Sequence, residues 1–233
     1  MRLRRGFAVA AAMAAASALV GGFAAGGAQA ADILQVTFQA DTSTVIAKTK
    51  QTVTFPTTQL VSTTDLKTLT GTLKLAQTSS SLNLGPLQAA SFKISVINAS
   101  PVTGTLTQGT LNGKPAINLD VKQTFQIRLD SVVPLGLSTG SADLNLVSNG
   151  QCVTTPITAS LAGQLDAADF VGQKPGTSGT VTGTYTIPPF GGCGAAQGII
   201  NSLIAGGGNT LSVRVYNPTF ATVPAPATAA ATS

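Results

Sequence analysis

Apolar and polar residues alternate along much of this chain, and no other feature constrains its fold as strongly. In "INLDVKQTFQIRL", from Ile117 to Leu129, the apolar residues take odd-numbered positions, while Asp120, Lys122 and Arg128 take even-numbered ones. Successive side chains of a strand point to opposite faces of a sheet, so this pattern predicts strands with one buried and one solvated face. Strands of this kind are typical of antiparallel sheets.

The same alternation recurs in short segments separated by turn residues. It is clear in "SFKISVIN", "TVTGTYTI" and "NTLSVRVY", and further strands are expected at "ILQVTFQ", "KQTVTF", "LTGTLKLA", "VTGTLTQ", "SADLNLV" and "ITASLAGQLD". Asn112-Gly113 is a hairpin signal, and Asn149-Gly150 and Pro175-Gly176 mark further breaks. Many short strands joined by turns predict an all-β, mostly antiparallel fold that is sandwich-like or barrel-like.

One segment near the C-terminus has helical spacing instead. Residues Ala195 to Ile204 predict one short C-terminal helix, which is expected to end at the glycine run 206–208. This helix is expected to pack against the last strand and to hold it in the sheet. The residues expected to face the core there are Ile199, Ile200, Leu203, Leu211, Val213 and Val215.

The first thirty residues have the pattern of a secretory signal peptide. A basic start, "MRLRR", precedes the apolar run "FAVAAAMAAASALV" and the small-residue site "AQA". We therefore assign residues 1–30 to a signal peptide, 31–222 to a single β-rich domain and 223–233 to a disordered Pro/Ala/Thr tail. The mature chain is expected to be secreted or in the cell envelope, without a membrane span; a retained membrane helix is the alternative. Arg4-Arg5 leaves both the Sec and the twin-arginine export routes open.

The charge pattern argues against one class of partner. Only 9% of the residues are charged, and every acidic residue is Asp. Without Arg2, Arg4 and Arg5 of the signal peptide, the net charge of +5 falls to +2, and the remaining basic residues are scattered singly. Nucleic acid is therefore not an expected partner. Polar surface has to come mainly from Thr, Ser, Asn and Gln, so Thr is expected on the solvated faces of the strands.

Two cysteines, Cys152 and Cys193, follow the signal peptide. An even number of cysteines in an exported chain predicts one disulfide bond. The chain has no His, so a Cys–His nucleophile cannot be built, and two thiols alone do not close a zinc site. The glycines around Cys193 lack the spacing of a phosphate-binding loop, and this stretch is interpreted as a structural corner. No catalytic, cofactor-binding or metal site is assigned.

Asp residues supply the remaining chemical candidates. Asp166 and Asp169 in "LDAADF" could form a carboxylate pair for glycoside hydrolysis, or act as turn and helix-cap formers. Asp120, Asp130 and Asp143 could help to hold calcium, although the chain has no calcium-binding loop motif. A structural role is the favoured interpretation in both cases.

Two C-terminal stretches, "GQCVTTPITASLAG" and "YTIPPFGGCGAAQGIINSLIAGGGNTLSV", resemble exported β-rich proteins of actinobacteria that have no assigned activity. The resemblance covers roughly the C-terminal third of the chain. It implies a secreted β-rich fold with a bridge between Cys152 and Cys193, and it assigns no functional residue.

The expected function is a non-enzymatic one, with a structural or binding role toward an unknown extracellular or cell-envelope partner. The first alternative is a carrier of a lipid or another apolar ligand, because Leu-, Ile- and Val-rich strands line a pocket as readily as they form a dry core. The second alternative is a hydrolase that uses Asp166 and Asp169. A continuous apolar cavity of a few hundred Å³ would favour the carrier.

Overall fold

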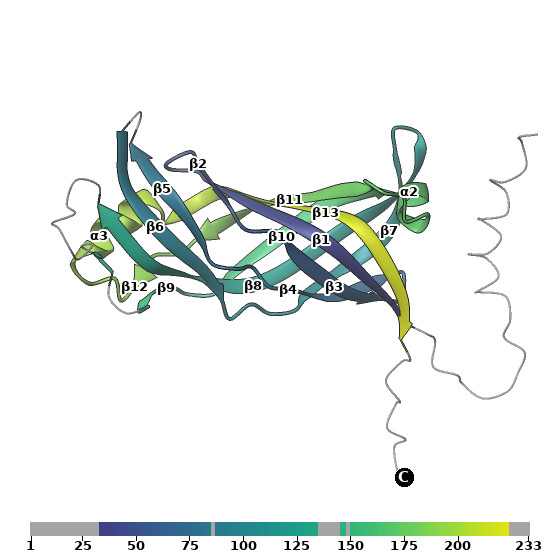
Figure 1. The fold of residues 1–233 in the computed structure, drawn as a ribbon, viewed down its shortest axis with the longest axis horizontal. Coiled ribbons are helices and arrows are strands. Elements are labelled where there is room, and N and C mark those ends of the chain that lie inside the picture. The colour runs from purple at the N-terminus through teal and green to yellow at the C-terminus, as the bar shows by residue number, and fades with distance from the viewer. Residues whose placement is uncertain (1–32, 85–86, 135–144, 148–149, 224–233) are drawn as a thin grey trace, which may run out of the picture. The chain divides into compact units, whose positions relative to one another are not determined.

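The computed structural model describes residues 33–84, 87–134, 145–147 and 150–223 (Figure 1). The predicted signal peptide lies outside these residues, as do residues 224–233 of the predicted tail. The final strand runs through Val223, the residue assigned to the start of that tail.

Antiparallel strands make up most of the described chain, which confirms the predicted all-β class. The predicted C-terminal helix is present as α3 (Gln197–Leu203), which follows one 3-10 turn, η1 (Gly194–Ala196). The strands are β1 (Ile33–Ile46), β2 (Gln51–Thr54), β3 (Thr58–Thr64), β4 (Thr68–Leu73), β5 (Thr78–Leu84), β6 (Leu87–Ile97), β7 (Val102–Leu111), β8 (Lys114–Pro134), β9 (Cys152–Thr154), β10 (Ile157–Asp166), β11 (Ser178–Ile187), β12 (Phe190–Gly191) and β13 (Gly206–Val223).

Part of this sheet closes into a ring of paired strands. The order is β10-β11-β13-β1-β3-β4-β7-β8, and β8 returns to pair with β10. The closing pairs run from Ile157 opposite Phe125 to Asp166 opposite Ala116. β8 is 21 residues long, and its second half pairs with β6 and β9 outside the ring. β6 in turn pairs with β5, β9 with β12, and β1 with β2.

The predicted alternation sets which face of each strand is buried. Along β1 every second residue from Val36 to Ile46 is buried. In β13 Val213 is buried, whereas its neighbour Arg214 is exposed. The β7–β8 hairpin turns at Asn112-Gly113, where φ values of +52° and +76° supply the left-handed backbone that such a turn requires. The predicted faces and the predicted hairpin are confirmed.

Threonine does not always take the solvated face that its polarity predicts. Thr42, Thr44 and Thr64 point inward and are only 1%, 8% and 4% exposed. Their place in the strand explains this, because Thr42 and Thr44 continue the inward row that Val36 and Phe38 begin on β1. Hydroxyl groups therefore lie inside the ring as well as outside it.

Two apolar clusters pack at opposite ends of the long strands. The first, which we call the α2-side cluster, includes Phe38 and Phe170 and contains a residue of the helix α2 (Ala167–Val171). The second, the α3-side cluster, includes Phe190 and Ile200 and contains residues of α3. Figure 1 shows the two helices at the two ends of the strands.

The predicted core face of the C-terminal helix is wrong at Ile199, whose side chain is 65% exposed. Ile200 and Ile204 are buried, and Leu203 packs against the same cluster. Successive residues of a helix are about 100° apart around its axis, so Ile199 lies outside the face that Ile200, Leu203 and Ile204 turn to the core. The glycine run 206–208 opens β13 and does not itself cap the helix.

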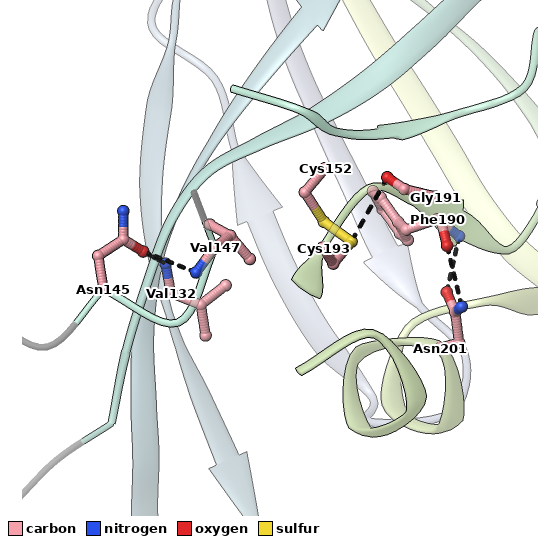
Figure 2. The surroundings of a disulfide bond; sticks show 8 residues. All are labelled: Val132, Asn145, Val147, Cys152, Phe190, Gly191, Cys193 and Asn201. Atoms are coloured by element: carbon pink, nitrogen blue, oxygen red, sulfur yellow. Dashed lines mark hydrogen bonds between the residues drawn. A yellow bond between two sulfur atoms is a disulfide. The ribbon is translucent and has the colours of Figure 1, made fainter. Parts of the chain in front are cut away.

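A second correction concerns the predicted strand "SADLNLV". Its residues 145–147 form no strand, and residues 141–144 lie outside the described part of the chain. The Oδ1 atom of Asn145 accepts hydrogen bonds from the backbone N–H groups of Val132 (2.9 Å) and Val147 (3.1 Å), as Figure 2 shows. The bond from Val132 and a second one, from the Leu146 N–H to the Val132 carbonyl oxygen (2.8 Å), hold the segment against β8 although it forms no strand.

Candidate functional site

An apolar cavity of about 300 Å³ lies inside the strand ring. Inward rows of all the ring strands line it, and most of the lining residues are Val, Leu, Ile or Phe from the two clusters. Among the described residues that line it, Lys122 alone is charged, and its side chain is exposed. The volume is within the range of small-molecule pockets, about 300–1,000 Å³. The cavity can therefore hold an uncharged, apolar molecule.

Ring closure and small inward residues together account for this space. A closed ring of about eight strands has an interior that side chains just fill, or that holds one small ligand. Ala159, Val181 and Val213 occupy inward positions on three ring strands, and all three line the cavity. Their short side chains leave room where longer ones would meet across the ring.

Aromatic side chains lie at the α2 end of the cavity. Phe170, which α2 carries, is 6% exposed and lines the cavity. Its ring stacks on Phe38 with a centroid distance of 5.8 Å and forms a T-shaped pair with Phe220 at 5.0 Å. α2 was not predicted, because five residues are too few to show a helical period.

A disulfide bond holds the α3 end together (Figure 2). Cys152 in β9 and Cys193 before η1 are bonded, with their Cα atoms 4.3 Å apart, and both are fully buried. Asn201 of α3 binds the backbone of the cavity-lining Phe190 twice, accepting from its N–H (2.7 Å) and donating to its carbonyl oxygen (3.1 Å). The glycine-rich stretch around Cys193 forms a structural corner between β11 and β13, as the sequence predicts.

The cavity reaches the surface beside the β3–β4 turn. The β4–β7 ladder ends at Thr68 opposite Thr105, and one further bond runs from the Leu106 N–H to the carbonyl oxygen of Lys67 (2.8 Å). Leu106 and Gln108 of β7 line the cavity, together with Leu66 of the turn. Leu66 is 66% exposed, so an apolar side chain stands at the mouth of the cavity.

Hydrogen bonds fix the turn that carries Leu66. Leu66 has a φ of +70°, a left-handed conformation that Leu rarely adopts. Its N–H donates to Thr64 Oγ1 (3.0 Å), and Asp65 Oδ1 accepts from the N–H groups of Thr68 (2.6 Å) and Lys67 (2.9 Å). These bonds to Asp65, the one from Thr68 first, lower the pKa of its carboxyl to about 2. The turn therefore keeps its bonds except at strongly acidic pH.

A short polar band crosses the cavity lining between the two clusters. It consists of Thr42 and Thr44 on β1 and Tyr185 on β11. Thr44 Oγ1 lies 2.7 Å from the Tyr185 hydroxyl oxygen and donates to the carbonyl oxygen of Thr210 (2.8 Å). Burial raises the pKa of Tyr185, and the hydrogen bond with Thr44 opposes this only in part. Tyr185 is therefore a neutral hydroxyl at physiological pH.

The two Asp residues considered for hydrolysis serve their own helix. Asp166 caps α2, because its Oδ1 accepts from the N–H of Asp169 at 3.0 Å. The carboxylate of Asp169 pairs with Lys174 at 3.2 Å. Neither Asp lines the cavity. The predicted role as turn and helix-cap formers is confirmed for this pair.

The Asp residues considered for calcium are not brought together. Asp120 is exposed on β8, Asp130 belongs to a separate polar network, and Asp143 lies outside the described residues. Across residues 33–84, 87–134, 145–147 and 150–223, no three His, Cys, Asp or Glu residues gather as metal ligands.

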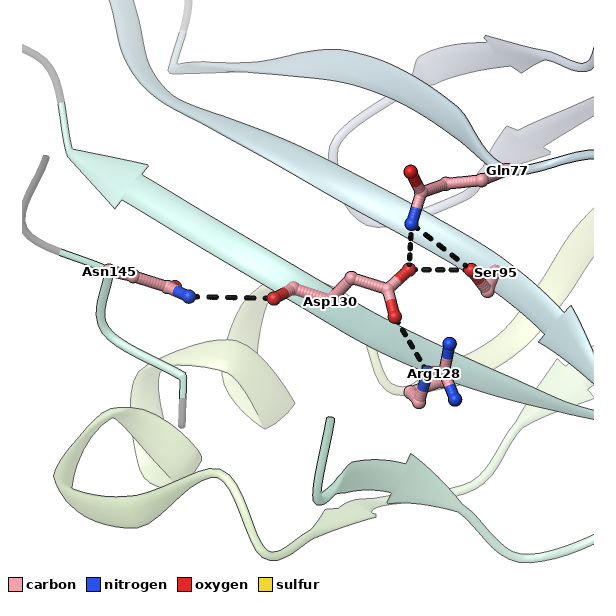
Figure 3. A network of polar contacts seen from close by, with 5 residues as sticks. All are labelled: Gln77, Ser95, Arg128, Asp130 and Asn145. Carbon is pink, nitrogen blue, oxygen red and sulfur yellow. Dashed lines mark hydrogen bonds and ion pairs between the residues drawn. The ribbon is translucent and has the colours of Figure 1, made fainter. Parts of the chain in front are cut away.

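Asp130 links three segments on the surface of the sheet (Figure 3). Its Oδ2 accepts from Ser95 on β6 (2.6 Å) and from Gln77 before β5 (2.7 Å), and its Oδ1 accepts from Arg128 Nε (2.6 Å). Burial acts to raise the pKa of Asp130, but these hydrogen bonds and the Arg128 charge outweigh it and hold the pKa below its usual value. The network stabilises the contact between β5, β6 and β8.

Replacing Asp130 with Asn should make folding stability less sensitive to acid. Because the folded-state pKa of Asp130 is lowered, its contribution is complete above the unfolded-state pKa of about 3.9 and is lost as the pH falls through the folded-state value. At pH 7 the variant should lose about 1.5–3 kcal/mol of folding stability, the typical value of hydrogen bonds to a charged group. Urea melts of both proteins from pH 7 to pH 3 would measure this. If the free energies of unfolding of the two proteins differed by the same amount at every pH, the role of the charged carboxylate would be contradicted.

No known protein family matches this chain, and no curated protein matches its sequence. In the part of the chain that the structure describes, no helix has the length and apolar character needed to cross a membrane.

Proposed function

We propose that this chain is a secreted or cell-envelope binding protein that carries a lipid or another apolar ligand inside its strand ring. The observation that supports the proposal is the apolar cavity of about 300 Å³. Of the functions considered from the sequence, the carrier is the one that this geometry favours. The predicted signal peptide and the resemblance to exported actinobacterial proteins support the location.

Packing energetics favour a binding site over a plain core. Protein interiors are normally packed to the density of organic crystals, with few voids larger than a water molecule. Opening a cavity costs roughly 24 cal/mol per Å³, so about 300 Å³ corresponds to several kcal/mol of lost contacts. An apolar ligand in the ring restores these contacts and gains the free energy of leaving water.

The polar groups of the lining support binding rather than catalysis. Apart from the ammonium group of the exposed Lys122, they are hydroxyls and amides, such as those of Thr44, Tyr185 and Gln123, and no carboxylate is among the described lining residues. Leu66 is exposed and lines the cavity, which supports an entrance for the ligand beside the β3–β4 turn. Such a site would hold a molecule by shape and apolar contact, with few directional bonds.

Filling the cavity from the protein side should abolish much of the binding. Ala159 points inward from β10, is 2% exposed and lines the cavity, whereas Ala162 on the same strand points outward. We expect Ala159→Leu to weaken binding of the neutral apolar dye Nile red at least tenfold, because the new side chain occupies ligand space. Ala162→Leu should stay within twofold of the wild type in the same fluorescence titration.

The stability of the Ala159→Leu variant distinguishes an open cavity from a filled core. In an open cavity the larger side chain should leave the free energy of unfolding within about 1 kcal/mol, whereas overpacking a filled core costs about 1–3 kcal/mol. Equal dye affinity in all three proteins would contradict the carrier function. If Ala159→Leu alone weakens dye binding, mass spectrometry of the lipids that co-purify with the protein from culture medium would identify the natural ligand class.

A further inference from the structure

The inward row of β1 runs along the cavity, and one pair of polar residues interrupts its apolar residues. Val36 and Phe38 belong to the α2-side cluster, and Ile46 belongs to the α3-side cluster. Thr42 and Thr44 lie between them on the same face of the strand. An elongated ligand that spans both clusters therefore passes a polar band with apolar walls on either side.

Within this band, Thr44 and Tyr185 satisfy each other. The single hydroxyl hydrogen of Thr44 is donated to the Thr210 carbonyl oxygen, so Thr44 Oγ1 is the acceptor of its 2.7 Å contact with Tyr185. Tyr185 then donates its own hydrogen to Thr44. Neither residue has a hydroxyl hydrogen left for a ligand.

Thr42 is different, because its hydroxyl has no hydrogen-bond partner among the described residues. The residue is 1% exposed and lines the cavity. A buried hydroxyl without a partner is destabilising, and most buried polar groups in native proteins are paired. A Val at this position would fit the row equally well and would avoid this cost.

We infer that Thr42 is the recognition residue of the cavity and that it donates a hydrogen bond to an uncharged oxygen acceptor, such as a ketone or ester carbonyl, located between two apolar arms of the ligand. This inference rests on the proposed carrier function and names the class of its ligand. The position of Thr42 between the clusters sets the acceptor inside the chain of the ligand and not at its end.

The charge of the lining excludes an ionised ligand group at this position. A carboxylate taken out of water needs a cation or several hydrogen-bond donors nearby. The one charged residue of the described lining, Lys122, has an exposed side chain. An internal carbonyl needs a single donor, and Thr42 supplies it.

Matched probes of one chain length test this inference. Pentadecane, 8-pentadecanone and pentadecanoate would each displace Nile red from lipid-free full-length protein. We expect the wild type to bind 8-pentadecanone about tenfold more tightly than pentadecane, and pentadecanoate more weakly than 8-pentadecanone. Thr42→Val should bring 8-pentadecanone within about twofold of pentadecane. Thr42→Ser, which keeps the hydroxyl, should retain the preference for the ketone.

Failure of the inference and failure of the carrier function give different results. If pentadecane and 8-pentadecanone bind the wild type equally well, or if Thr42→Val keeps the preference, the role of Thr42 is wrong but the carrier function stands. If no probe displaces the dye, both are wrong. Ligand-free Thr42→Val should also unfold at the same or a higher urea concentration than the wild type. A clearly lower midpoint would mean that the hydroxyl is already satisfied, and would overturn the inference.

Discussion

Replacing both Cys152 and Cys193 with Ala should lower the free energy of unfolding by about 4 kcal/mol. The bond closes a loop with a sequence separation of 41, and in the chain-entropy account a cross-link of this span stabilises the folded state by about that amount. The surrounding strands are short, since β9 has three residues and β12 has two, and β9 pairs with β8 at only two positions. The bond is therefore the main covalent restraint on this end of the cavity.

Urea melts without reductant would measure the effect of the double substitution. The wild type treated with dithiothreitol is the matched control. Its free energy of unfolding should agree with that of the double variant within about 1 kcal/mol. Titration of the untreated, denatured wild type should detect no free thiol. Equal unfolding midpoints for the oxidised wild type and the double variant would contradict the stabilising role of the bond.

The strand faces could be predicted from the sequence because a strand has a period of two that local residues reveal. Val213 and Arg214 are neighbours, and their opposite exposure follows directly from that period. The hairpin at Asn112-Gly113 is equally local, since two residues set its backbone. These features require no knowledge of distant parts of the chain.

The cavity could not be predicted, because it depends on which distant strands pair. Ring closure pairs Ile157 on β10 with Phe125 on β8. The inward residues on the opposite side of the ring come from β1, near the start of the described chain. The same inward residues would form a dry core if the ring were narrower. Thr42 shows most clearly where prediction from the sequence stops. Its residue type predicts the solvated face, and only its parity with Val36 and Phe38 indicates that it points inward.

Short elements carried too little signal to be found. α2 has five residues, and its Asp166 cap is a residue type that is equally frequent in turns. The sequence therefore offered Asp166 and Asp169 as a hydrolytic pair or as a cap, and the choice needed the hydrogen bond that the structure supplies. This helix matters, because it brings Phe170 to the end of the cavity.

Replacing Phe170 with Ala should cost about 3–5 kcal/mol of folding stability, the largest effect that we expect from a single substitution. Truncation of a buried Phe removes its transfer free energy and leaves a void. The variant also loses the contacts that the Phe170 ring makes with Phe38 (5.8 Å) and Phe220 (5.0 Å). Such aromatic pairs stabilise the folded state by more than their buried area alone. A five-residue helix has little intrinsic stability, so α2 depends on this side chain to stay on the ring.

Val171→Ala is the matched control for Phe170→Ala, because it lies next to Phe170 on the same helix but is 58% exposed. It should change the free energy of unfolding by no more than about 0.5 kcal/mol, as is usual for exposed positions. Denaturant melts of the two variants would give the comparison. A loss below about 1 kcal/mol for Phe170→Ala would mean that α2 is not packed on the ring as described. If the loss is large, Nile red should also leave the variant faster than the wild type, because the aromatic cluster then no longer closes this end of the proposed ligand cavity.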